Sequence, residues 1–228
     1  LVKERLAGFG VPIYELSGFE ADDVIGTIGT RMEQEPDVQT IIVTGDMDTL
    51  QLVRGTKTGV FTLRKGMTDT VTYDEDGVRA RLGVGPEHVI DLKGLKGDPS
   101  DNIPGVPGPG DKTAAALVTA FGTVEQVIEA AQQDNPQKPL TPKLTETLRT
   151  HAQEALFSKR LATITTDAPV AFDLASADWK RHADIAVLEA FCNRMGFASL
   201  IRRVREAASP QESLLAPRET TAPAQTSL

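Results

Sequence analysis

The apolar residues follow two different periods along the chain. After an acidic start, they recur at the spacing of an amphipathic helix, at Val24, Ile25, Ile28 and Met32. Residues 38–44 are instead a short run rich in β-branched side chains without polar alternation, which predicts a strand buried on both faces. Such strands belong to parallel sheets covered by helices, so the pattern predicts an α/β fold.

The rest of the pattern predicts a strand pair and then a mainly helical region. Residues 60–63 and 71–73 flank a basic turn and predict a hairpin at a sheet edge. Further helices are predicted over residues 75–82, 86–95, 112–120, 124–131, 143–161, 185–191 and 197–204, and a short strand over 161–165. We therefore predict a core over residues 1–97, a helical region over 98–206, and a disordered linker or tail over 207–228.

Composition narrows the class of protein. With 40% hydrophobic and 25% charged residues, the chain has the make-up of a soluble globular protein. No apolar run approaches the roughly 18 residues of a membrane span. Cys192 is the single cysteine, which excludes an internal disulfide and a zinc site of several thiolates, so a cytoplasmic location is expected. The chain begins with Leu1 rather than Met, which predicts a piece of a longer protein.

The net charge of −8 argues at first against a nucleic-acid partner, because phosphate binding relies on Lys and Arg. The charge is not spread evenly, however. Acids gather near Glu20, Asp46 and Asp98, whereas Lys112 and Lys143 offer separate positive places. Divalent ions would also offset the acids, so a nucleic-acid partner stays open.

Seven acidic residues form three groups. They are Glu20, Asp22 and Asp23 at a helix start, Asp46 and Asp48 after the buried strand, and Asp98 and Asp101 on a proline-containing turn. Ligands bind beyond the carboxyl ends of parallel strands, and carboxylate oxygens suit hard cations. Hydrolysis of a phosphodiester with two such ions needs many oxygen ligands, so the groups predict one shared metal site. Alternatively, the acids merely cap helices and complement their dipoles.

A glycine-rich bend follows the third acidic group. Gly108 and Gly110 allow a tight turn, and Lys112 and Thr113 begin an Ala-rich helix whose free N–H groups can receive a phosphate. The bend therefore predicts contact with a nucleic-acid backbone. Because Gly and Pro are also ordinary turn formers, a simple turn is the alternative interpretation.

Three motifs together resemble the 5′ nuclease (flap endonuclease-like) family, found at the amino end of bacterial DNA polymerase I. They lie at residues 18–26, 45–53 and 97–114, and their order and spacing agree with the family. The resemblance runs from residue 1 to about residue 206, and the tail resembles a linker to a polymerase region. It implies a PIN-like sheet flanked by helices, followed by a helix-hairpin-helix motif.

The resemblance also implies an activity, together with the residues and ions that would carry it out. The activity is 5′-3′ exonuclease and flap endonuclease cleavage of DNA in replication and repair, at 5′ flaps, nicked duplex and RNA-primed ends. The implied metal ligands and catalytic residues are Glu20, Asp22, Asp23, Asp46, Asp48, Asp98 and Asp101. The implied DNA-binding residues are Gly105, Val106, Gly108, Gly110, Lys112 and Thr113. We expect two Mg²⁺ or Mn²⁺ ions, a monovalent cation at the hairpin, a monomer covalently linked to a polymerase region, and a location in the bacterial cytoplasm with the nucleoid.

Some features depart from the family and leave alternatives open. Family members begin with strands that carry further aspartates and with a basic arch, which this sequence lacks. Met47 replaces a commonly basic residue, and Pro109 removes one backbone N–H from the bend. A non-catalytic DNA-binding module therefore remains an alternative. An aspartate-nucleophile phosphatase is disfavoured because Leu50 stands where that motif needs Thr or Val.

Overall fold

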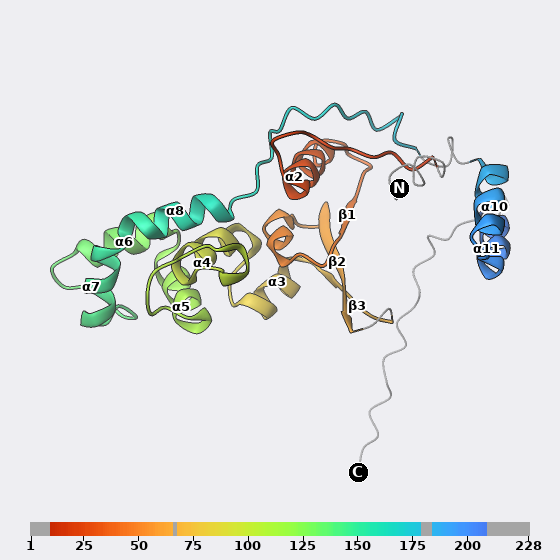
Figure 1. Cartoon of the computed structure of the whole chain (residues 1–228). Helices are drawn as coiled ribbons and strands as arrows, with labels where there is room; N and C mark the ends of the chain where they lie inside the picture. Colours follow the sequence, from red (N-terminus) through yellow and green to blue (C-terminus); the bar gives the residue numbers. More distant parts are fainter. Residues whose placement is uncertain (1–9, 66–67, 179–183, 209–228) are drawn as a thin grey trace, which may run out of the picture. The chain divides into compact units, whose positions relative to one another are not determined.

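The chain forms two compact units. The structure is a computed structural model that describes residues 10–65, 68–178 and 184–208 (Figure 1). One unit comprises residues 14–171, and the other comprises residues 1–13 and 172–228. Trp179 and most of the tail predicted over 207–228 lie outside the described residues, whereas Cys192 is buried, as expected of a packing residue.

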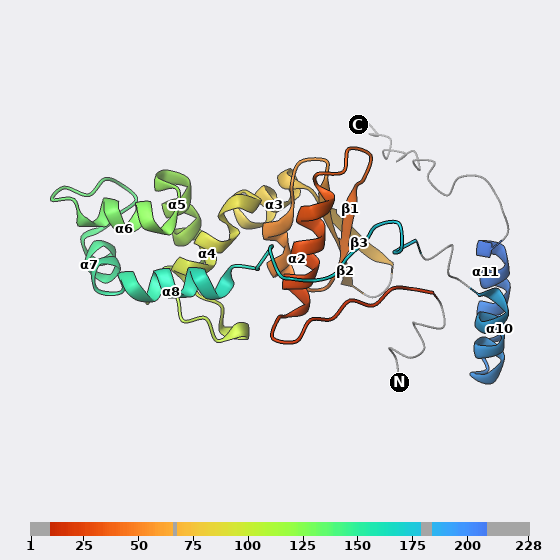
Figure 2. The same ribbon diagram turned by 90° about the horizontal axis from the view of Figure 1, so that it is seen from above.

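The larger unit combines a small sheet with short helices (Figures 1 and 2). Its strands are β1 (Thr40–Val43), β2 (Thr58–Lys65) and β3 (Asp69–Tyr73). Its α-helices are α2 (Ala21–Met32), α3 (Glu75–Leu82), α4 (Val89–Lys96), α5 (Asp111–Phe121), α6 (Val124–Gln132), α7 (Pro142–Thr150) and α8 (Ala152–Ala162). Its 3-10 helices are η1 (Met47–Leu52), η2 (Pro86–His88) and η3 (Pro99–Asp101). The smaller unit contains α10 (Ile185–Arg194) and α11 (Ala198–Ala208).

The sheet of the larger unit is mixed. Strand β1 pairs with β2 in parallel, with Thr40 opposite Thr58, and β2 pairs with β3 antiparallel. The strand order is β1-β2-β3. The parallel pair and the edge hairpin agree with the sequence prediction, and they place the carboxyl end of β1 directly before η1.

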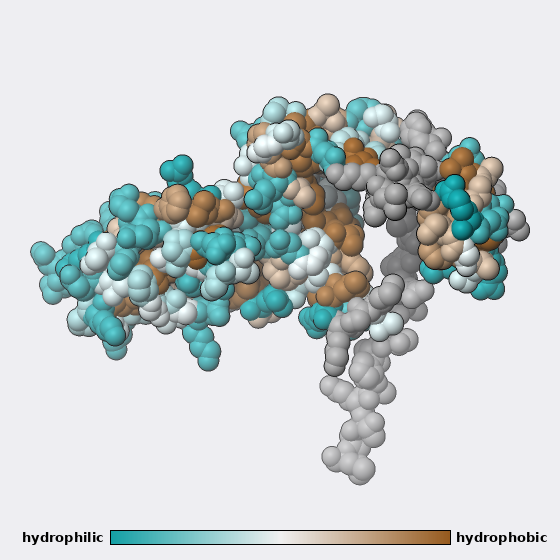
Figure 3. All heavy atoms as spheres, viewed as in Figure 1, coloured by the Kyte–Doolittle hydropathy of each residue, from teal (hydrophilic) through white to brown (hydrophobic). Residues whose placement is uncertain are grey.

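Strand β1 is buried on one face only, so the prediction of burial on both faces was wrong. Ile42 is 5% exposed and packs in a core cluster with Leu50 and Val60. Ile41 and Val43, on the opposite face, are 44% and 72% exposed, because no described residue covers them. Hydrophobic atoms are visible at the surface over the sheet (Figure 3). The β-branched run thus predicted the strand correctly and its environment incorrectly.

Helix α4 connects the two hydrophobic cores of the larger unit. Val89, at its first position, packs in the core of the sheet. Leu92 and Leu95, one and two turns later, pack in the core of the helical region and are at most 2% exposed. The buried α4 therefore packs against both the sheet and the helices, and it carries the turn that follows it.

The helices of the larger unit are short. The single helix predicted over residues 143–161 is wrong, because the chain breaks at His151 into α7 and α8. Among the described residues no single helix is long and apolar enough to cross a membrane. Helices α5 and α6 reach that length and composition only as a pair, bent by 81°.

Residues 163–165 are held by side chains rather than by a sheet, so the strand predicted over 161–165 was also wrong. Helix α8 continues to Ala162, and the following backbone is extended without strand pairing. The Ile164 N–H donates to Gln51 Oε1 at 2.9 Å, and the Thr165 N–H donates to Asp23 Oδ1 at 2.8 Å. This segment therefore ties α8 back to η1 and α2.

Two glycines shape the turn after α4. Gly97 and Gly105 have φ values of 74° and 62°, in the left-handed region. A Cβ atom on Gly97 would lie 2.7 Å from the carbonyl oxygens of Ile103 and Pro104, and one on Gly105 would collide with the Gly97 backbone. The two ends of the turn can approach this closely only because neither residue has a side chain.

We expect Gly105→Ala to lower the free energy of unfolding by about 2–3 kcal/mol, since it adds left-handed strain to a backbone collision. Urea denaturation followed by circular dichroism measures the change. Gly45→Ala is the matched control, because Gly45 lies outside the left-handed region and an added Cβ there meets nothing within 4 Å. A loss for Gly105→Ala no larger than for the control would contradict this account of the turn.

Candidate functional site

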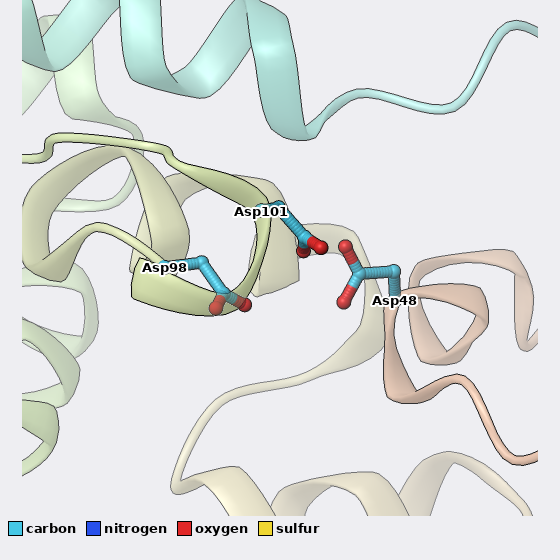
Figure 4. Close-up of side chains that lie close together, drawn as sticks. All are labelled: Asp48, Asp98 and Asp101. Atoms are coloured by element: carbon cyan, nitrogen blue, oxygen red, sulfur yellow. The ribbon is translucent and has the colours of Figure 1, made fainter.

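Three aspartates from two separate parts of the chain gather at one place (Figure 4). Asp48 lies in the first turn of η1, just beyond the carboxyl end of β1. Asp98 and Asp101 come from the turn after α4. One carboxylate oxygen of each residue lies within 4.8 Å of the others. Three converging carboxylates are the donor set that Mg²⁺ and Mn²⁺ prefer, so the residues fit a divalent metal ion.

Local backbone structure presents Asp98 and Asp101 on the same side. The Asp98 N–H donates to the Ile103 carbonyl and the Ile103 N–H donates to the Asp98 carbonyl, both at 2.9 Å. Between them, Asn102 has a φ of 56°, which Asn tolerates better than most residues. The Asp98 carboxylate also accepts the Ser100 N–H at 3.0 Å. These hydrogen bonds join the two ends of the turn and hold Asp98 and Asp101 in place.

Lys93 on α4 lies among the three carboxylates, and sequence reasoning missed it. Its side chain is 8% exposed, and its ammonium pairs with Asp48, with Asp98 at 2.8 Å and with Asp101 at 3.6 Å. One signal could have found it: Lys93 falls four residues after the core residue Val89, on the buried stripe of α4. A buried lysine needs a partner of opposite charge, and the acidic cluster supplies it.

The lysine changes the electrostatics of its partners unequally. Burial raises the pKa of Asp98, but hydrogen bonds from Lys93 and Ser100 outweigh it and lower that pKa to about 2. For Asp48, burial outweighs the hydrogen bond from Lys93, and the pKa is raised. Asp98 is therefore the more firmly ionised carboxylate of the two.

The first two acidic groups contribute further charge near this cluster. Burial and the neighbouring charges of Asp46 and Asp48 raise the pKa of Asp22. Asp22 therefore lies within electrostatic reach of the second acidic group. Asp46 is exposed, and one of its oxygens accepts the Asp48 N–H at 3.0 Å, which caps η1.

Glu20 and Asp23 have structural roles at the start of α2. One oxygen of Asp23 accepts the Glu20 N–H at 3.0 Å, and the other accepts the Thr165 N–H at 2.8 Å. The capping alternative raised by the sequence thus describes these contacts. Neither residue belongs to the carboxylate cluster formed by Asp48, Asp98 and Asp101.

Two of the residues predicted to bind DNA have their backbone N–H groups engaged inside the protein. The Gly105 N–H donates to Ser158 Oγ at 2.9 Å, and the Val106 N–H donates to the Leu95 carbonyl at 2.8 Å. Both residues are buried. They hold the bend against α4 and α8.

The other four predicted DNA-binding residues are exposed at the start of α5: Gly108, Gly110, Lys112 and Thr113. Gly110 is the N-cap of α5 and provides no side-chain acceptor, so the first N–H groups of the helix have no cap from it. Asp111 beside them is paired with Lys96 at 2.7 Å, which offsets its negative charge. The bend therefore presents the first backbone N–H groups of α5 and the Lys112 ammonium to the solvent.

We expect Asp22→Asn to stabilise the ion-free protein at pH 7 by on the order of 0.5 kcal/mol, because the Asp22 charge is partly buried and lies near other carboxylates, and both effects are weak at a partly exposed site. The pKa of Asp22 is raised in the folded state, so its charge destabilises the fold above that pKa and has no effect below the ordinary value of 3.8. Thermal unfolding in chelator at pH 7 and pH 3 measures this, with the exposed Asp37→Asn as control. Equal shifts of the melting temperature at both pH values would contradict an effect of the Asp22 charge.

Comparison with known proteins identifies the class. Residues 1–83 match the family model described as 5′-3′ exonuclease, N-terminal resolvase-like domain, and residues 84–184 match the one described as 5′-3′ exonuclease, C-terminal SAM fold. The chain therefore belongs to the 5′-3′ exonuclease family. The family models meet after residue 83, and our boundary after residue 97 remains a prediction.

Among individual proteins, the chain is 42% identical over 216 residues to DNA polymerase I of Bacillus caldotenax, covering 95% of this chain and 24% of the relative. It thus spans about a quarter of the length of that relative. The fold is similar to that of T5 5′-exonuclease with bound zinc (TM-score 0.55, 23% identity, 85% of this chain and 61% of the other). It is also similar to a T5 flap endonuclease variant in a pseudo-enzyme–product complex with DNA and metal ions (TM-score 0.53, 21% identity, 85% and 61%).

Proposed function

We propose that this chain is the nuclease part of a DNA polymerase I, and that it cleaves DNA phosphodiesters as a structure-specific 5′-3′ exonuclease and flap endonuclease. The observation that carries the proposal is the convergence of Asp48, Asp98 and Asp101 from separate parts of the fold. The family membership of the chain and its likeness to a polymerase support the same function.

Divalent ions, Mg²⁺ or Mn²⁺ in our proposal, would be held by these three carboxylates, with Asp22 and Asp46 as further ligands directly or through water. When bound, they supply Lewis-acid activation of water and neutralise charge on the phosphate. Glu20 and Asp23 act in our proposal by fixing the start of α2, and so the position of Asp22. We propose two ions at the site and a monovalent cation at the bend.

The protein's own residues would position the DNA. Lys112 and Thr113, with the N–H groups at the start of α5, bind backbone phosphate without reading the base sequence. Gly108 and Gly110 let the duplex approach, because an added Cβ at either would project into open space. Buried Gly105 and Val106 support this helix-hairpin-helix from within. The substrates we propose are 5′ flaps, nicked duplex and RNA-primed ends.

We propose a monomer, covalently joined to a polymerase region, in the bacterial cytoplasm and associated with the nucleoid. The likeness to Bacillus caldotenax DNA polymerase I, of which the chain matches 24%, supports the link to a polymerase.

The test measures cleavage of a 5′-flap duplex and a nicked duplex with Mg²⁺ or in chelator. It uses the chain by itself and a chimaera in which the chain replaces the matching 216 residues of the Bacillus caldotenax polymerase. Magnesium-dependent release of a fragment from the 5′ side, leaving a 5′-phosphate on the product, is expected of the chimaera. A chain that binds the flap by itself, together with a folded chimaera that leaves the flap intact, would instead establish the alternative, a non-catalytic DNA-binding module.

A further inference from the structure

A single ammonium lies within contact distance of all three clustered carboxylates. Lys93 Nζ lies 2.8 Å from Asp98 Oδ2 and 3.6 Å from Asp101 Oδ2, and it also pairs with Asp48. The same three carboxylates present oxygens within 4.8 Å of one another. The lysine and a metal ion would therefore draw on the same oxygen ligands.

The backbone around Lys93 is closely packed. Its neighbours Leu92 and Leu95 are buried in the core of the helical region. A Cβ on Gly94 would lie only 3.0 Å from side-chain atoms of Val124 and Lys159, which shows how closely α4 is packed. Any rearrangement at the site therefore falls to the side chain of Lys93, whose ammonium starts from a position among the three carboxylates.

We propose that Lys93 is a built-in counter-ion, which takes the place of a divalent ion in the ion-free protein and sets how tightly the site binds one. This inference rests on the divalent metal site of the proposed function. Without Lys93 the three carboxylates would repel one another in the ion-free fold. With it, an incoming ion must compete with the ammonium for the same oxygens and is repelled by its positive charge. Lys93 is thus a positioning residue: it stabilises the ion-free site and lowers the affinity of that site for a divalent ion.

The test compares Lys93→Met, which keeps the length of the side chain without its charge, with Lys96→Met. Lys96 lies on the same helix, but its ammonium pairs with Asp111 at 2.7 Å, outside the cluster. We expect Lys93→Met to raise the affinity for Mn²⁺, measured by calorimetry, about tenfold or more. We also expect it to lower the melting temperature in chelator and to increase the stabilisation that Mn²⁺ confers. Lys96→Met should change the affinity less than twofold.

A second measurement uses the unmodified protein, in case Lys93→Met does not fold. The Lys93 ammonium resonance, assigned with Lys93→Arg, should shift as Mg²⁺ is added, while that of Lys96 should not. A folded Lys93→Met that binds Mn²⁺ no more tightly than the unmodified protein, or an unchanged Lys93 resonance at saturating Mg²⁺, would overturn the inference alone. Absence of Mn²⁺ binding by the unmodified protein would overturn the metal site of the proposed function as well.

Discussion

Replacing Asp98 with asparagine is expected to lower the rate of flap cleavage by about a thousandfold, which corresponds to about 4 kcal/mol of lost transition-state stabilisation. Asparagine has nearly the same shape and can still accept the Ser100 N–H, which bonds to Asp98 Oδ1 at 3.0 Å. What it removes is the charge of a carboxylate whose pKa the structure lowers to about 2. The measurement is single-turnover cleavage of a 5′-flap duplex by the chimaera at saturating Mg²⁺.

Asp76→Asn is the control for this variant, because the Asp76 side chain is 95% exposed on α3. A fold check separates lost chemistry from lost structure. The pKa of Asp98 is lowered to about 2 from 3.8, so its charge stabilises the fold above pH 3.8, and this contribution is lost as the pH falls towards 2. The variant should lack that part of the acid sensitivity. A folded Asp98→Asn protein that cleaves at the unmodified rate would remove Asp98 from the site.

Replacing Asp91 with alanine is expected to lower the free energy of unfolding by about 3–5 kcal/mol, the usual cost of removing one partner from a buried ion pair. The Asp91 side chain is 2% exposed. It accepts the Val124 N–H at 2.9 Å and the Lys159 ammonium at 2.8 Å, and it lies 3.0 Å from His88 Nδ1. One carboxylate thus connects α4 to the start of α6 and to α8.

Alanine at this position leaves the Val124 N–H buried without an acceptor and opens a cavity. Urea denaturation in chelator measures the loss. Asp91→Asn should cost less than alanine, since it keeps the shape and an acceptor for that N–H. Glu125→Gln is the matched control: Glu125 also pairs with Lys159, at 2.7 Å, but is 55% exposed, and it should cost at most about 1 kcal/mol. If alanine at Asp91 costs no more than this control, the helical region does not depend on the network.

The sequence predicted best the helices whose ends are set by neighbouring residues. The helix predicted over residues 75–82 is present as α3: Asp74 caps its start, and Gly83 ends it in the left-handed conformation. Thr123 caps α6 in the same way. The helix ranges 75–82 and 124–131 were predictable because capping depends on residues three or four positions apart.

Predictions about the surroundings of an element were less secure. The run around Ile42 predicted a strand, but whether Ile41 and Val43 are covered depends on which other elements pack there. Likewise, residues 163–165 have β-forming side chains, yet Gln51 and Asp23 hold them by hydrogen bonds across the fold. No local pattern contains these partners.

The sequence by itself determined the three acidic groups, the glycine bend and the family that their order resembles, because each motif is written in consecutive residues. Only the tertiary structure decided which acids meet. It brings Asp48 to Asp98 and Asp101, and it leaves Asp23 with hydrogen bonds to the backbone. It also places Lys93 between the acids, since α4, β1 and the turn after α4 converge only when the two cores pack together.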